Sequence, residues 1–149
     1  MNLVPSRISE ELAVVKRPDS ARLRDAIFKL EEWNAERPQV EIEYIHRFTP
    51  GVYAREMIVP AGLLITGAIH KTEHISIFLQ GKLLIPEEYG SREISAPIVE
   101  IAKPGVKRCG VVLEDVRWIT LHPTEETDIA VLEDLLFTND PQMLLSADD

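Results

Sequence analysis

Cysteine is nearly absent from this chain of 149 residues: Cys109 is the only one, so no disulfide can form within the chain. Long apolar runs are absent as well, and none approaches the roughly 20 residues that a membrane-spanning helix needs. Basic residues are outnumbered, 16 against 25, and a net charge of −9 repels nucleic-acid phosphates. The first residues lack the pattern of a signal peptide. We therefore expect a cytoplasmic protein with neither nucleic acid nor membrane as its partner.

The chain does contain enough apolar residues, 45% of the total, to bury a core without a disulfide or a structural metal. No internal repeat or low-complexity segment divides it. We predict a single domain with three parts. These are a helical extension over residues 1–39, a β-barrel over residues 40–123, and a helix with a tail over residues 124–149.

Two segments have the apolar spacing of a helix. The first follows Asp19 and Ser20, which can cap a helix, and ends before Pro38. The second follows an acidic stretch at residues 124–128. The apolar positions are Leu23, Ile27 and Leu30 in the first segment, and Ile129, Leu132, Leu135 and Leu136 in the second.

Between these helices the period of the apolar residues changes to two, which is typical of strands. Turn residues such as Gly81 and the pair Glu114 and Asp115 separate the runs. About eight short strands of this kind predict an antiparallel sandwich or barrel. The runs span residues 40–46, 53–59, 63–67, 75–79, 82–85, 94–101, 106–113 and 116–121.

One spacing within the strand region is specific. Gly62 is followed after five residues by Ala68, Ile69 and His70, then after three residues by His74, and after six more by Gly81. This frame resembles the first motif of the cupin superfamily. In cupins two histidines and a glutamate occupy the ligand positions of the frame, so the resemblance places Ala68 at the first histidine and His74 at the glutamate.

A second cupin motif would run from Pro97 through Gly105 to Arg108 and Val112. Gly105 fits this motif, whereas Arg108 stands at the place of a ligand histidine and Val112 at that of an asparagine. The resemblance to cupins covers residues 40–122. It departs from the family at the residues that define its metal chemistry.

The chain also resembles small cupin-like proteins of tailed phages and prophages, which would place it in the host cytoplasm. The phrases that carry this resemblance are residues 70–74, 113–115, 118–124 and 132–136. It implies an all-β, cupin-like antiparallel jelly-roll barrel with an N-terminal helix and a C-terminal helix. It also implies a homodimer that pairs through exposed strand edges.

Three of the four histidines, His70, His74 and His122, fall in or beside the cupin frame. Neutral imidazoles bind divalent metals such as Zn, Ni, Mn or Fe, so these three are candidate metal ligands. On a continuous strand, residues 70, 72 and 74 would share one face. The alternative is that they are structural histidines, hydrogen-bonded to their neighbours.

The place of His122 depends on a hairpin that we predict around Glu114 and Asp115. A two-residue turn would set His122 opposite Lys107, with Arg108 facing the other way. A three-residue turn or a bulge would slip the register by one residue, and His122 would then share a face with Arg108. The sequence leaves both registers open.

Three further side chains are candidate ligand-binding residues. Arg108 can bind a carboxylate or a phosphate, although an ion pair with one of the many carboxylates is the alternative. Phe78 and Trp118 can line a cavity, although both can equally be core aromatics. By its parity Glu73 should point outward, and Cys109 should be a small buried residue.

Two functions follow from these candidates. We favour a binding protein without established catalysis, in which the barrel takes a small polar or anionic ligand at Arg108. The alternative is a metal-dependent enzyme in which His70, His74 and His122 hold one divalent ion. No catalytic residue is predicted for either.

Overall fold

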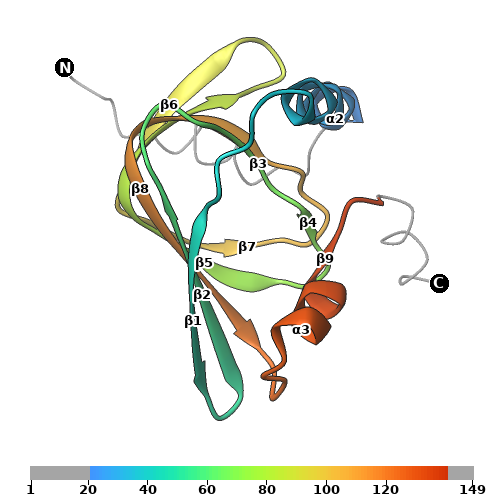
Figure 1. The fold of residues 1–149 in the computed structure, drawn as a ribbon, viewed down its shortest axis with the longest axis vertical. Coiled ribbons are helices and arrows are strands. Elements are labelled where there is room, and N and C mark those ends of the chain that lie inside the picture. The colour runs from blue at the N-terminus through green and yellow to red at the C-terminus, as the bar shows by residue number, and fades with distance from the viewer. Residues whose placement is uncertain (1–20, 141–149) are drawn as a thin grey trace.

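The computed structural model describes residues 21–140, and antiparallel strands dominate them (Figure 1). Asp19 and Ser20, the expected caps of the first helix, lie outside the described residues. The elements, in chain order, are α2 Ala21–Ala35, β1 Glu43–Thr49, β2 Val52–Val59, β3 Leu64–Thr66, β4 Ile69–His70, β5 His74–Pro86, β6 Ser91–Ser95, β7 Ile98–Ala102, β8 Cys109–Pro123, α3 Ile129–Leu136 and β9 Phe137–Thr138.

Seven strands form one curled sheet in the order β1-β2-β8-β5-β6, with β3 paired to β8 and β7 paired to β5. The short strands β4 and β9 pair separately. Every pairing is antiparallel, with α2 before the strands and α3 near their end. The predicted fold class, an all-β antiparallel jelly-roll barrel with a helix on either side, is confirmed.

The prediction of a hairpin at Glu114 and Asp115 is wrong. Both registers that we considered for His122 depended on that hairpin, so they are wrong as well. Residues 109–123 form one continuous strand, β8, which pairs along its length with β2 and then β3 in a single register. The neighbouring chain bends instead, at Ala61 and Gly62, where the Ala61 amide donates to the carboxylate of Asp115 at 2.8 Å. Because a partner strand extends both before and after residues 114–115, the chain continues where its local sequence favours a turn.

Two other strand boundaries also differ from the prediction. The runs around Gly81 are one strand, β5, whose pairing with β8 is irregular between Phe78 and Leu83. Gly81 has φ +107°, and a Cβ atom there would collide with the carbonyl oxygens of Glu114 and Asp115, so the bulge requires glycine. The run 94–101 is divided into β6 and β7 around Pro97, which lacks an amide hydrogen for the sheet.

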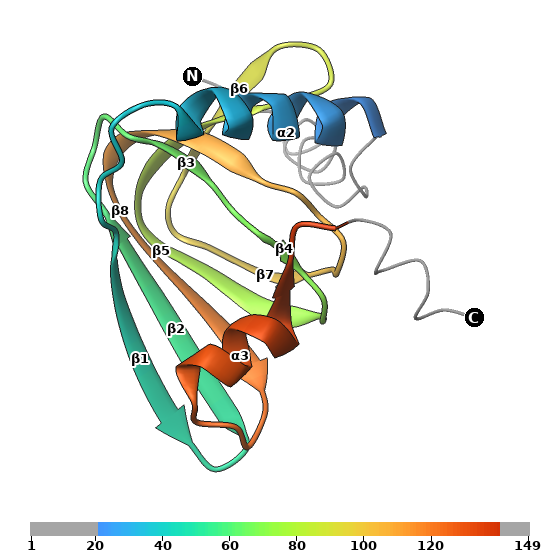
Figure 2. The same cartoon turned by 45° about the vertical axis from the view of Figure 1, so that its right-hand side comes forward.

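Both helices pack against the barrel (Figures 1 and 2). The helix α2 lies across one end, near β3, and buries Ile27 as expected. Asp128 caps α3 by accepting from the amides of residues 130 and 131. The helix α3 packs Leu132 and Leu136 against Tyr53 of β2, whereas Leu135, expected on the same apolar stripe, is exposed. Neither described helix is long and apolar enough to cross a membrane.

A buried lysine holds α2 on the barrel. The Lys107 ammonium donates to Glu31 of α2 at 2.6 Å, to the carbonyl of Gly67 at 2.7 Å and to the side chain of Asn139 at 3.0 Å. Arg24 of α2 donates to the carbonyl of Gly105 at 2.8 Å. The helix, the β3–β4 connection and the end of β9 therefore share one polar anchor.

The apolar core lies toward the half of the barrel where β5 bulges against β8. Its buried residues are Val59, Phe78, Leu83, Val112 and Val116. The residues that face inward at the other end of β5 and β8, His74 and His122, are polar and buried. The barrel interior therefore changes from apolar to polar along its strands.

Candidate functional site

The three histidines predicted as a group lie together inside the barrel. The ring centres of His70 and His74 are 4.2 Å apart, those of His74 and His122 are 4.8 Å apart, and those of His70 and His122 are 5.7 Å apart. Their planes differ by 11° to 31°. We call His70, His74 and His122 the histidine cluster.

Three separate strands bring the cluster together. His122 is near the end of β8, His74 begins β5, and His70 ends the short strand β4. Residues 70 to 74 do not form the continuous strand on which residues 70, 72 and 74 would share one face. The amide of Lys71 instead donates to the carbonyl of Leu136 at 2.8 Å, which turns the chain between the two histidines.

Burial keeps the cluster uncharged. Loss of solvent, reinforced by the neighbouring histidines and by Arg108 and Arg55, lowers the pKa of His70 from 6.5 to about 2. Loss of solvent, with His74 and Arg55 nearby, lowers the pKa of His122 to about 4. Burial also lowers the pKa of His74. At neutral pH the cluster therefore consists of three neutral imidazoles.

Hydrogen bonds leave ring nitrogens of the cluster available. The Nδ1 of His74 donates to the carbonyl of Thr72 at 3.0 Å, so its Nε2 carries a lone pair. The Nε2 of His122 contacts the Thr120 hydroxyl at 2.9 Å. The Nδ1 of His122 is buried and has no hydrogen-bond partner within residues 21–140. A buried polar atom of this kind is costly unless it binds something.

Two arginines lie close enough to the cluster for their charges to lower the pKa of His70. Arg108, a predicted ligand-binding residue, donates to Glu100 of β7 at 3.3 Å and keeps 38% of its side chain exposed. Arg55 of β2 lies 3.4 Å from Glu133 of α3, and its Nε atom is buried without a partner among the described residues. The surroundings of the cluster therefore contain guanidinium donors with unused capacity.

Aromatic side chains enclose the cluster. Phe137 of β9 meets the His70 ring edge-on at 4.8 Å, and the Arg55 guanidinium lies 4.6 Å from the centre of the same phenyl ring. Tyr53 stacks on His122 at 5.8 Å. The Tyr53 hydroxyl shares a hydrogen bond of 2.5 Å with Nδ1 of His46. Burial raises the pKa of Tyr53, so the phenol stays protonated at neutral pH.

Three neighbours of the cluster were not predicted from the sequence: Arg55, Glu100 and Phe137. Arg55 could have been identified from the sequence. It lies between Tyr53 and Met57 at a spacing of two residues, so all three share one face of a strand and an arginine lies on an otherwise apolar face. Glu100 lies in the apolar run 94–101, which the sequence predicts to be one strand and which the structure divides into β6 and β7. The contribution of Phe137 depends on β9, a two-residue strand with no pattern of its own.

Phe78 and Trp118 lie deeper in the barrel than the cluster. Their rings stack at 4.7 Å, and the indole N–H of Trp118 donates to the Ser76 hydroxyl at 2.6 Å. Phe78 is 1% exposed and belongs to the apolar core. Glu73 is exposed and pairs with Lys103 at 2.6 Å, and Cys109 is buried, both as expected.

The donor chemistry of the cluster suits a divalent metal, because three neutral imidazoles and the unpartnered Nδ1 of His122 are the nitrogen donors that such ions prefer. The present arrangement does not suit one. Two of the three ring pairs are stacked and the third is tilted, and across residues 21–140 no three or more His, Cys, Asp or Glu side chains are arranged to hold a metal ion. The nearby arginines add positive charge.

No family model and no curated protein matches this chain. Solved structures of cupin domains do match. A cupin-2 domain protein from Shewanella frigidimarina has 12% identity and a TM-score of 0.41, over 64% of this chain and 92% of that one. A cupin domain from Bordetella pertussis has 12% identity and a TM-score of 0.46, over 59% and 98%. KdgF from Halomonas sp. has 22% identity and a TM-score of 0.45, over 62% and 93%.

Proposed function

We propose that this chain is a cupin-like binding protein whose barrel takes a small anionic ligand with a carboxylate or phosphate group. The observation that carries the proposal is the pair of arginines, Arg55 and Arg108, beside a cluster of neutral histidines, with Nε of Arg55 buried and unpartnered among residues 21–140. An anion would satisfy this donor and gain from both charges.

The histidine cluster supports an anionic ligand because it stays neutral. Neutral imidazoles donate and accept hydrogen bonds without competing with the guanidiniums for the negative charge. The 3.3 Å contact between Arg108 and Glu100 is long for a charge-assisted hydrogen bond. A bidentate carboxylate or phosphate on Arg108 would make shorter contacts.

Calorimetric titration of the full chain with inorganic phosphate and with succinate tests this function. Wild type should bind at least one of them, and Arg108→Gln should weaken that binding by at least about tenfold, the effect of one charge-assisted hydrogen bond. Arg92→Gln is the matched control, since Arg92 also pairs with a carboxylate, Glu87, but in β6. A wild-type protein that binds neither probe contradicts the proposal, and so does an Arg108→Gln variant with unchanged affinity.

A metal-binding function is the second candidate, supported by the lone pair on Nε2 of His74 and the unpartnered Nδ1 of His122. The ligands would be His70, His74 and His122 after their rings rotate out of the stack. A bound Zn, Ni, Mn or Fe would supply Lewis acidity. Metal analysis of protein purified without an affinity tag should then find about one equivalent per chain, and protein without bound metal contradicts this candidate.

We also propose a phage or prophage source, with the host cytoplasm as the compartment. The sequence phrases at residues 70–74, 113–115, 118–124 and 132–136 support this proposal. Genes for phage structural or replication proteins on either side of the coding sequence would support it further, and a neighbourhood of host genes without any phage gene would contradict it.

A further inference from the structure

The outward face of the sheet is unusually apolar where β5, β7 and β8 lie side by side. Ile75 and Ile77 of β5 alternate with the inward-facing His74, Ser76 and Phe78. Across the sheet, Ile75 pairs with Ile101 and Leu121, while Ile77 pairs with Val99 and Ile119. Directly paired residues share a face, and we call this set, together with Leu79, the outer apolar face.

Four members of the outer apolar face are substantially exposed: Val99 at 69%, Ile101 at 64%, Ile75 at 45% and Leu79 at 44%. Such exposures leave on the order of 400 Å² of apolar surface on these four side chains, as much as the largest patch on a typical monomer. The two helices within residues 21–140 pack elsewhere, since α2 contacts β3 and α3 packs on Tyr53 and β9. A face of this size is typical of an interaction surface.

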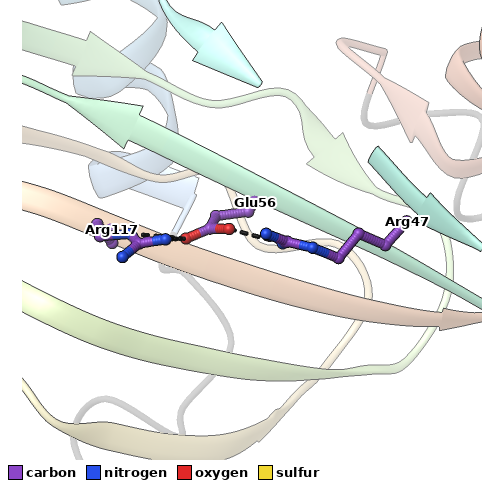
Figure 3. Close-up of polar contacts among 3 residues, drawn as sticks. All are labelled: Arg47, Glu56 and Arg117. Atoms are coloured by element: carbon purple, nitrogen blue, oxygen red, sulfur yellow. Dashed lines mark hydrogen bonds and ion pairs between the residues drawn. The ribbon is translucent and has the colours of Figure 1, made fainter. Parts of the chain in front are cut away.

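Along one border of the outer apolar face, charged side chains replace the apolar ones (Figure 3). Glu56 pairs across the sheet with Ile119 and is 1% exposed, because Arg47 covers it from one side and Arg117 from the other. The ion pairs measure 2.6 Å to Arg47 and 2.5 Å to Arg117. The face therefore carries no unpaired carboxylate at this border, and its two half-exposed arginines form a polar rim.

We infer that the outer apolar face binds a second copy of this chain and forms a homodimer. A standard interface buries roughly 800 Å² on each partner, of which somewhat more than half is apolar. The four exposed residues, with the half-buried Ile77, Ile119 and Leu121, supply an apolar area of that size. A two-fold dimer brings the same patch of both subunits together, and a uniformly apolar patch is complementary to itself.

This surface differs from the strand edges through which the cupin resemblance suggests dimerisation. An interface at an edge would use the free side of β1, where main-chain hydrogen bonds would join two sheets. The outer apolar face would instead use side chains of β5, β7 and β8. The inference is independent of the ligand proposed for the barrel interior.

Sedimentation equilibrium of the full chain across the micromolar range tests the inference. Wild type should be a dimer, and Val99→Asp and Ile101→Asp should each raise the dimer dissociation constant by at least about 30-fold, because each buries a charge at the centre of the interface. Both residues are more than half exposed in the single chain, so the variants should still fold and give the circular-dichroism spectrum of wild type. Val131→Asp, an exposed position on the helix α3, is the matched control and should remain dimeric.

Two results would overturn the inference. A wild-type protein that is monomeric throughout the micromolar range shows that the face does not bind a second copy. A dimer that persists in both aspartate variants places the contact elsewhere, for example at the edge of β1. Neither result affects the binding of phosphate or succinate, so the two proposals fail separately.

Discussion

Lowering the pH from 7.5 to 5.5 should destabilise this protein through the histidine cluster. His70, His74 and His122 are neutral in the folded chain because burial lowers their pKa values. In the unfolded chain each protonates near pH 6.5. A lowered folded-state pKa means that the unfolded state binds more protons below pH 6.5. The stabilising effect is therefore complete above that pH and is lost as the pH falls.

The size of the loss follows from the pKa values. The folded-state pKa is about 2 for His70 and about 4 for His122, so neither protonates in the folded protein at pH 5.5. Each then lowers the free energy of unfolding by about 1.4 kcal/mol at pH 5.5, or about 3 kcal/mol together. His74 acts in the same direction. A small domain has only about 5–15 kcal/mol in total, so the change is large.

Urea unfolding at pH 7.5, 6.5 and 5.5, in phosphate-free buffer with a chelator, measures this effect. The range stays above the titration of ordinary carboxylates. His122→Gln should reduce the pH dependence by about one proton, whereas His46→Gln, which removes the histidine outside the cluster, should retain it. A free energy of unfolding that is equal or higher at pH 5.5 than at pH 7.5 would refute the assignment of three neutral interior imidazoles.

Three further predictions concern the fold. Lys107→Met should lower the free energy of unfolding by about 1.5–3 kcal/mol, because it removes the charge-assisted hydrogen bonds of a fully buried ammonium, including its ion pair with Glu31; Lys103→Met, at a 65% exposed ion pair, should cost less than about 1 kcal/mol by the same urea assay. Gly81→Ala should lower the free energy of unfolding by about 2–4 kcal/mol in thermal unfolding, because the added Cβ atom collides with the backbone of β8. Gly90 also has a positive φ, +98°, but lies in open space, so an equal loss of stability in Gly90→Ala would contradict this reason. Glu56→Gln should lower the free energy of unfolding by about 1–3 kcal/mol at pH 7. Because Arg47 and Arg117 hold the pKa of Glu56 below 4.5, the difference in stability from wild type should shrink as the pH falls below that value. A constant difference in acid titrations monitored by circular dichroism would contradict the ion pairs.

The strand content of the fold could be predicted from the sequence because period-two alternation is a local signal. The ends of the strands could not. Residues 114–115 have turn chemistry, yet they lie within β8 because β2 and β3 both pair with that strand. Gly81 looks like a turn in the sequence and is a bulge in β5, because carbonyl groups of β8 approach its backbone. Such non-local contacts have no trace in the neighbouring sequence.

The candidate site was predicted in its members but not in its geometry. His70 and His74 meet because the chain turns between β4 and β5, and not because they share one face of a continuous strand. Arg55 was identifiable by its place on an apolar strand face, whereas Phe137 reaches the cluster only through the pairing of β4 with β9. The roles of Phe78 and Trp118 in binding stay predictions.

The central claim is that three neutral imidazoles and two guanidiniums inside the barrel bind an anion. Nitrogen-15 NMR of the histidine side chains at pH 6, with inorganic phosphate added stepwise, tests it most directly. We predict that His70, His74 and His122 give neutral-imidazole signals that shift saturably with phosphate, and that Arg108→Gln needs at least about tenfold more phosphate for the same shift. Protonated signals from these residues, or neutral signals that ignore phosphate and succinate alike, would contradict the claim.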